Sequence, residues 1–87
     1  MDKLNEFTQK FQAQYIDGAD IKITADTDFR QIGSWDSLTG MAVLVMIQDE
    51  YGIDIPIDKF KGLLTVKDVY NYIHKELKNK NESFLDT

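Results

Sequence analysis

The chain has 87 residues, of which 43% are hydrophobic, with one proline and five glycines, the composition of a single small globular domain spanning residues 1–87. It contains no cysteine and one histidine, so it lacks the residues for a disulfide framework or a thiolate nucleophile, and we expect no metal site. Fifteen acidic and ten basic residues give a net charge of −5, which disfavours nucleic acid and anionic membranes as partners.

The first predicted helix covers residues 3–16. Its apolar positions recur at steps of three and four residues, as an amphipathic helix requires, and are Leu4, Phe7, Phe11 and Tyr15. Asp17-Gly18 supplies the stop. From Asp17 to Asp36 the periodicity is lost, so we expect a long ordered loop that includes a short helical turn.

A second helix is predicted from Ser37 to about Tyr51. Asp36 or Ser34 is the expected capping residue, because a side-chain oxygen there can accept from the unpaired N–H groups of the first turn. Gly52 is the expected C-terminal stop.

Seven consecutive apolar residues, Met41 to Ile47, form the middle of this segment. The run is also compatible with a buried strand, and Gly40 lowers the helix propensity by roughly 1 kcal/mol, but the length between cap and stop favours a helix. Because such a run points in every direction around a helix, some side chains, Met41 and Val45 among them, must point away from the core.

One short helix is predicted over residues 56–62. Pro56 begins it, and Ile57 and Phe60 are expected to pack on the core. The fold class is therefore all-α, with three long helices, one short helix and a long first loop.

The last helix begins at Thr65 to Asp68, which resembles a capping box. Its apolar positions are Val66, Val69, Tyr70, Ile73 and Leu77. We expect it to end near Lys78 and residues 79–87 to fray.

No feature of the sequence predicts a membrane segment or an assembly. The longest apolar run is far shorter than the about 20 residues of a membrane span, and residues 1–16 lack the apolar segment of a signal peptide. We therefore expect a cytoplasmic protein without membrane contacts. No heptad seam is present, so a monomer is expected.

Ser37 is the candidate site because it lies in the first turn of the long second helix, directly after Asp36. The first turn has unpaired N–H groups and about half a positive charge, so a phosphodiester attached there is expected to gain about 0.3–1 kcal/mol. The simpler interpretation is that the serine hydroxyl caps the helix.

The residues around this serine, and their spacing, resemble the acyl carrier protein family. The matching residues are Ile32-Gly33, Trp35-Asp36-Ser37-Leu38, Asp49-Glu50-Tyr51-Gly52-Ile53-Asp54-Ile55-Pro56, Phe60 and Thr65-Val66-Lys67-Asp68-Val69. With the leading helix and the long first loop, the resemblance covers nearly the whole chain and implies a small acyl-carrier-like helical bundle.

The resemblance implies that Ser37 accepts 4′-phosphopantetheine from coenzyme A, transferred by a separate phosphopantetheinyl transferase. Acyl groups are then carried as thioesters on the thiol of this arm, which a cysteine-free chain cannot supply itself. The protein is expected to be a carrier that other enzymes use as a substrate, and not an enzyme. Asp36 is either the helix cap or a contact to the metal and the transferase.

Charge and apolar exposure indicate how partner enzymes dock. Nine acidic and two basic residues lie between Asp17 and Asp58, and this acidic stripe is either a solvated face or steers basic patches of partners toward the serine. The second helix has acids only at its far end, whereas many carriers have more, so apolar contact is expected to matter more here. The candidate partner-binding residues are Trp35, Leu38, Met41, Val45, Asp49 and Glu50.

The cargo stays open at this level. Trp35 and the sparsely acidic second helix favour a dedicated biosynthetic pathway, with an acyl- or aminoacyl-loading ligase and downstream enzymes as partners. The alternatives are an aminoacyl or peptidyl carrier that serves an adenylating ligase, and a helical interaction module that receives no prosthetic group. Residues on the apolar faces of the later helices either part around an acyl chain or form ordinary core: Val43, Ile47, Leu63, Val69 and Ile73.

Overall fold

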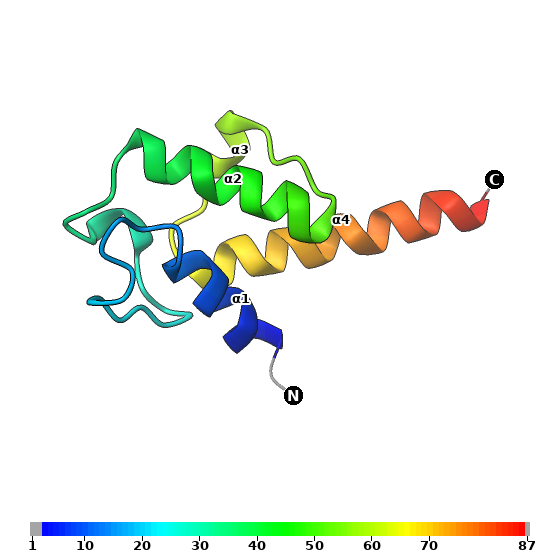
Figure 1. Ribbon diagram of the computed structural model, residues 1–87. Helices are drawn as coiled ribbons and strands as arrows, with labels where there is room; N and C mark the ends of the chain where they lie inside the picture. The colour runs from blue at the N-terminus through cyan, green and yellow to red at the C-terminus, as the bar shows by residue number, and fades with distance from the viewer. Residues whose placement is uncertain (1–2, 87) are drawn as a thin grey trace.

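Four α-helices and one 3-10 turn make up this computed structural model, which describes the backbone of residues 3–86 and the side chains of residues 3–79. The elements are α1 (Lys3–Gln12), η1 (Phe29–Gln31), α2 (Ser37–Tyr51), α3 (Ile57–Lys61) and α4 (Val66–Asp86). α1 contacts α2 and α4, and in Figure 1 it runs opposite to both. The predicted all-α bundle with a long first loop is confirmed. Within residues 3–86, no helix is long and apolar enough to cross a bilayer.

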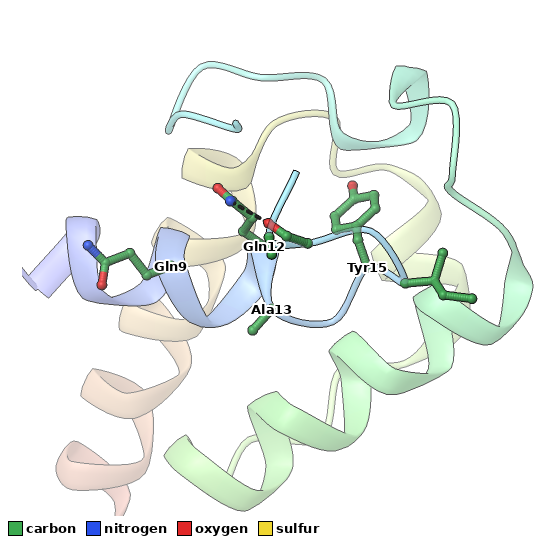
Figure 2. A pocket seen from close by; sticks show the side chains of 7 residues that line it. Gln9, Gln12, Ala13 and Tyr15 are labelled. Atoms are coloured by element: carbon green, nitrogen blue, oxygen red, sulfur yellow. Dashed lines mark hydrogen bonds between the residues drawn. The ribbon is translucent and has the colours of Figure 1, made fainter. Parts of the chain in front are cut away.

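α1 ends at Gln12, earlier than the predicted residue 16. From residue 14 on, the N–H groups bond three residues back instead of four, so the chain turns away from the helix axis. The side-chain amide of Gln12 fixes the new direction. It donates to the Gly18 carbonyl at 2.8 Å, the dashed line in Figure 2, and to the Ile21 carbonyl at 2.6 Å, and its oxygen accepts from Ile23 N–H at 3.2 Å. The helical spacing of the apolar residues therefore continues beyond the last residue of the helix, as far as Tyr15.

The loop between α1 and α2 is ordered and includes the expected helical turn, η1. The Tyr15 hydroxyl, buried in the core, donates to the Phe29 carbonyl at 2.5 Å and so joins the start of the loop to η1. Backbone hydrogen bonds also join the loop to the start of α4, through the pairs Val66–Thr27 (3.3 Å) and Lys67–Ala25 (2.9 Å).

The bounds of α2 agree with the prediction. Gly52 ends the helix in the left-handed conformation, with a φ of 69°, and its N–H donates to the Gln48 carbonyl. Glycine adopts this conformation without the steric penalty that a Cβ atom would bring.

α3 has the predicted position, but only one of its two expected core residues is buried. Phe60 is 6% exposed and anchors the helix, whereas Ile57 is 58% exposed, so the prediction that Ile57 packs on the core is wrong. A helix of five residues makes little more than one turn, and Phe60 is its one buried residue.

α4 begins with the predicted capping box and extends further than predicted. Asp68 N–H donates to Thr65 Oγ1 and Thr65 N–H to Asp68 Oδ2, both at 3.1 Å. The helix then continues to Asp86, so the predicted end near Lys78 is wrong; no glycine or proline follows that lysine to stop it. The last turns extend beyond the other helices, in red in Figure 1. Fraying of residues 79–87 stays a prediction, because the side chains from residue 80 on lie outside the described residues.

One hydrophobic cluster runs through the bundle and receives side chains from every helix and from the loop. Its fully buried members are Phe7, Phe11, Phe29, Val43, Ile47, Val66, Val69 and Ile73. Four of the five residues considered for a cargo cavity, Val43, Ile47, Val69 and Ile73, are thus packed core residues, and the fifth, Leu63, lies partly buried against them.

Candidate functional site

α2 begins at Ser37 because Asp36 caps it. Asp36 has an extended backbone, and its Oδ1 accepts hydrogen bonds from the N–H and the hydroxyl of Thr39, at 2.8 and 2.9 Å. The Asp36 carbonyl accepts the first intrahelical bond, from Gly40 N–H. These bonds, above all the one from Thr39 N–H, hold the pKa of Asp36 below its ordinary value of 3.8. Of the two roles expected for Asp36, the structure contains the cap, and contact to a metal or transferase stays a prediction.

Ser37 is the first residue of α2 and is exposed. The capping role that the simpler interpretation gave to Ser37 belongs to Asp36, which already receives the Thr39 N–H. Ser37 is therefore an exposed serine at the positive end of a 15-residue helix.

Ser34, the alternative cap, has a different partner. Its hydroxyl donates to Asp17 Oδ1 at 2.6 Å, which joins the start of the loop to the segment that leads into α2. The two serines near the helix start thus differ: one is bonded within the loop and the other is exposed at the helix head.

Four rings hold the chain just before the serine and are called the aromatic cluster here: Tyr15, Phe29, Trp35 and Phe60. Trp35 lies 5.1 Å from Phe29 and 5.9 Å from Tyr15 between ring centroids, so this predicted partner-binding residue is partly buried in the cluster. The indole edge also lies on α2, where a Cβ atom added to Gly40 would be 3.2 Å from Trp35 Cζ2. Gly40, interpreted from the sequence only as a weak helix former, makes room for this ring.

Arg30 was not singled out by the sequence analysis. Its guanidinium donates to the carbonyls of Leu63 and Phe60, at 2.5 and 2.7 Å, and lies 4.5 Å from the Phe29 ring and 5.2 Å from the Phe60 ring. The signal that could have found it is that Arg30 is the chain's one arginine, placed next to an aromatic residue in an otherwise acidic loop.

An apolar strip on α2 begins at the serine. Leu38, Met41 and Val45 are 75%, 61% and 54% exposed, which confirms that apolar side chains of this helix point away from the core. Ser37, Met41 and Val45 follow one another at steps of four, so they share one face of the helix. We call Leu38, Met41 and Val45 the apolar face. Next to it lies an open hollow of about 400 Å³, lined by Gln14, Ala42, Val45, Met46, Asp49 and Glu50.

The two acids of α2 differ in their contacts. Glu50 forms an ion pair with Lys10 of α1, with 2.8 Å between Nζ and Oε1, and this bond raises the pKa of Lys10. Asp49 forms no ion pair within the described residues and continues the spacing of four from Val45. Asp49 is therefore the acid of this helix that remains available to a basic partner.

The described residues contain no group of three or more histidine, aspartate or glutamate side chains placed to hold a metal ion. The one histidine, His74, is exposed on α4, with its ring 4.3 Å from that of Tyr70.

Comparison with known proteins adds an independent finding. A family model described as a phosphopantetheine attachment site matches residues 12–73. The chain is 41% identical over 54 residues to an acyl carrier protein of Thermobifida fusca, covering 62% of this chain and 68% of that protein. It is 32% identical over 78 residues to one of Treponema denticola (90% and 100% covered), and 35% identical over 72 residues to one of Rickettsia typhi (83% and 84% covered).

Proposed function

The chain belongs to the acyl carrier protein family, and on this premise we propose that Ser37 is the residue that carries its 4′-phosphopantetheine. Members of this family are carriers and not catalysts, and a phosphopantetheinyl transferase installs their covalent prosthetic group. When bound, the group supplies the thiol that this cysteine-free chain lacks.

The observation that carries the proposal is the exposed hydroxyl of Ser37 at the head of α2, within the matched residues 12–73. The Asp36 cap fixes the helix start on one side of Ser37, and Trp35 anchors the chain two residues before it. In the transfer, a bond forms between Ser37 Oγ and the phosphorus of the arm, the pyrophosphate bond of coenzyme A breaks, adenosine 3′,5′-bisphosphate leaves with the bridging oxygen, and the hydroxyl proton passes to a base of the transferase or to water.

Intact mass spectrometry tests this assignment. The protein is incubated with coenzyme A, magnesium and a broad-specificity transferase, beside the variants Ser37→Ala and Ser34→Ala. We expect the mass of one phosphopantetheine to be added to the wild type and to Ser34→Ala, and nothing to be added to Ser37→Ala. Addition to Ser37→Ala, or no addition to a folded wild type, would contradict the assignment and favour a helical module without a prosthetic group.

We also propose that partner enzymes dock on the apolar face of α2. Leu38, Met41 and Val45 lie next to the attachment residue and are exposed, so a partner that covers them gains apolar contact while it holds the arm. Asp49 adds one carboxylate at the edge of this surface for a basic group on the partner. Trp35 and Glu50, the other predicted contacts, are partly committed to the aromatic cluster and to Lys10.

A dedicated biosynthetic pathway is the setting we infer for this carrier. α2 offers a partner few acids and an apolar surface, so an enzyme that recognises it must complement a particular apolar shape and not a row of charges. The loading enzyme is an acyl ligase or, in the alternative, an adenylating ligase that supplies an aminoacyl group. The cytoplasmic location and the monomeric state expected from the sequence stay predictions.

A further inference from the structure

We propose that Arg30 latches α3 against the first loop and keeps the core closed beside Ser37, so that the cargo of this carrier stays outside the bundle and is short or polar. The inference concerns the cargo class and rests on the proposed attachment at Ser37.

The latch is the guanidinium of Arg30, bonded to two carbonyls at and just after the end of α3. It donates to Phe60 through Nη2 and to Leu63 through Nη1. A cation is favourable at a helix C-terminus, where the last carbonyls have no partner within the helix. The guanidinium also lies over the rings of Phe29 and Phe60 and 6.0 Å from that of Trp35, so one side chain joins α3, the loop and the residue two positions before the serine.

α3 has little else to hold it in place. Phe60 is its one buried residue, and exposed apolar side chains lie on both sides of that anchor, with Ile57 58% and Leu64 57% exposed. The stack of Phe60 on Phe29, at 5.6 Å between centroids, and the Arg30 bonds therefore set the position of the helix together. Loss of the guanidinium should loosen α3 while α2 keeps its cap and its own core contacts.

Behind the latch the core is filled. Phe29, Val43 and Ile47 are fully buried, so an acyl chain that enters past α3 must displace packed side chains. A movement of the whole of α3 breaks both guanidinium bonds, and rotation of the Phe60 ring alone breaks its stack on Phe29 and its contact with the guanidinium. A short or polar acyl group has little apolar surface to gain from burial, and it can remain in water without the exposed patch that a long alkyl chain would create.

Hydrogen exchange of the unmodified protein tests the latch without any cargo. We compare the wild type with Arg30→Gln and Arg30→Lys, and use Lys22→Gln as the control because Lys22 is an exposed base of the same loop. We expect Arg30→Gln to raise the exchange rates of the Gly62 and Leu63 amides at least about tenfold, with the amides of α2 unchanged. Arg30→Lys should give a smaller increase, because an ammonium lacks the fork that bonds two carbonyls at once, and Lys22→Gln should give none.

Loading experiments test the consequence for the cargo. Wild type and Arg30→Gln receive acetyl- or octanoyl-phosphopantetheine from the corresponding acyl coenzyme A, and intact mass confirms the addition. In the wild type we expect the same Val43, Ile47 and Ile73 methyl shifts with both cargoes, and no nuclear Overhauser contact between the octanoyl chain and these methyls. In Arg30→Gln, octanoyl contacts to these methyls should appear.

Two results would overturn the proposal. One is an octanoyl chain that contacts Val43 or Ile47 in the wild type, where the latch is intact. The other is a folded Arg30→Gln protein whose Gly62 and Leu63 amides exchange as in the wild type. If Arg30→Gln does not fold, Arg30→Lys and the wild-type loading decide the question. Failure of the mass addition would instead count against attachment at Ser37, and the exchange experiment would still decide the latch.

Discussion

Asp36 shows how one carboxylate determines where a functional residue lies. It accepts the Thr39 N–H and hydroxyl, so the helix begins one residue later and presents Ser37 as its first, exposed residue. The capping rules admitted Ser34 equally well from the sequence. The choice between them depends on a contact from elsewhere in the chain, because the Ser34 hydroxyl is bonded to Asp17.

The Asp36 cap makes a prediction about acid stability. Its pKa is lowered in the folded protein, so its charge stabilises the fold above the ordinary value of 3.8, and this contribution is lost as the pH falls through the lower, folded value. Asp36→Asn keeps a capping oxygen but has no charge to lose. In urea denaturation followed by circular dichroism, we expect the variant to be less stable than the wild type at pH 7, and this difference to shrink below pH 3.8.

Asp26→Asn is the matched control, since it removes one exposed charge from the loop without touching a cap. A stability difference between Asp36→Asn and wild type that stays constant from neutral to acidic pH would show that the carboxylate charge does not contribute through the cap.

At the level of elements, Gly40 of α2 has two opposing effects, and the sequence indicates only one of them. Gly40 weakens the helix, yet it lies where the edge of the Trp35 indole contacts the helix surface. A Cβ atom at this position would force the ring, which holds the chain before Ser37, to shift by a few tenths of an ångström. Gly40 therefore lets Trp35 hold the loop in place, although it lowers the stability of the helix that contains it.

Gly40→Ala tests these two effects. Alanine favours the helix by about 1 kcal/mol, but its Cβ atom would lie 3.2 Å from Trp35 Cζ2, which is closer than ordinary contact. We expect the free energy of unfolding to rise by clearly less than about 1 kcal/mol in the wild type, and by the full amount in a Trp35→Phe background. Urea denaturation of the four proteins measures the coupling, and an equal gain in both backgrounds would rule out the contact.

The ends of α1 and α4 illustrate why element boundaries were harder to predict than element positions. α1 stops at Gln12 because that side chain bonds to the carbonyls of Gly18 and Ile21 in the loop that follows, although apolar spacing continues to Tyr15. α4 runs to Asp86 because no residue after Lys78 stops it, although the apolar periodicity weakens there. The apolar periodicity of a sequence indicates which face of a helix is buried. The end of a helix depends instead on which groups pair with its last backbone carbonyls.

For the molecule as a whole, the excess of acidic residues and the exposed apolar face lie in the same segment of the chain. The net charge of −5 is concentrated between Asp17 and Asp58, and the one arginine in that segment is bonded to Phe60 and Leu63. We propose that this acidic charge attracts basic surfaces of partner enzymes toward the apolar face beside Ser37.

Met41→Glu tests the apolar face as the contact surface. It places a charge in the middle of that face, so we expect kcat/KM for modification by the phosphopantetheinyl transferase to fall by about tenfold or more. Ile16→Glu is the control, because Ile16 is 93% exposed in the loop after α1 and the variant has the same net charge. With circular dichroism unchanged in both proteins, equal rates for the two variants would contradict docking on this face.

The sequence by itself determined the order of the helices and the places where α2 and α4 begin. It also determined the stop at Gly52 and the candidate serine. Each of these depends on neighbouring residues or on a local period. It also indicated that Met41 and Val45 point outward, since seven apolar residues in a row cannot all face one core. Whether residues 1–87 act as one domain stays a prediction.

Only the tertiary structure decided which oxygen caps α2, why Gly40 is small, where α1 ends, and that Arg30 bonds α3. Each of these depends on particular side-chain atoms that the fold brings together, at separations from three residues (Asp36 and Thr39) to 30 residues (Arg30 and Phe60). Arg30 and Leu63 are 33 residues apart, and no local pattern in the sequence encodes a hydrogen bond between them.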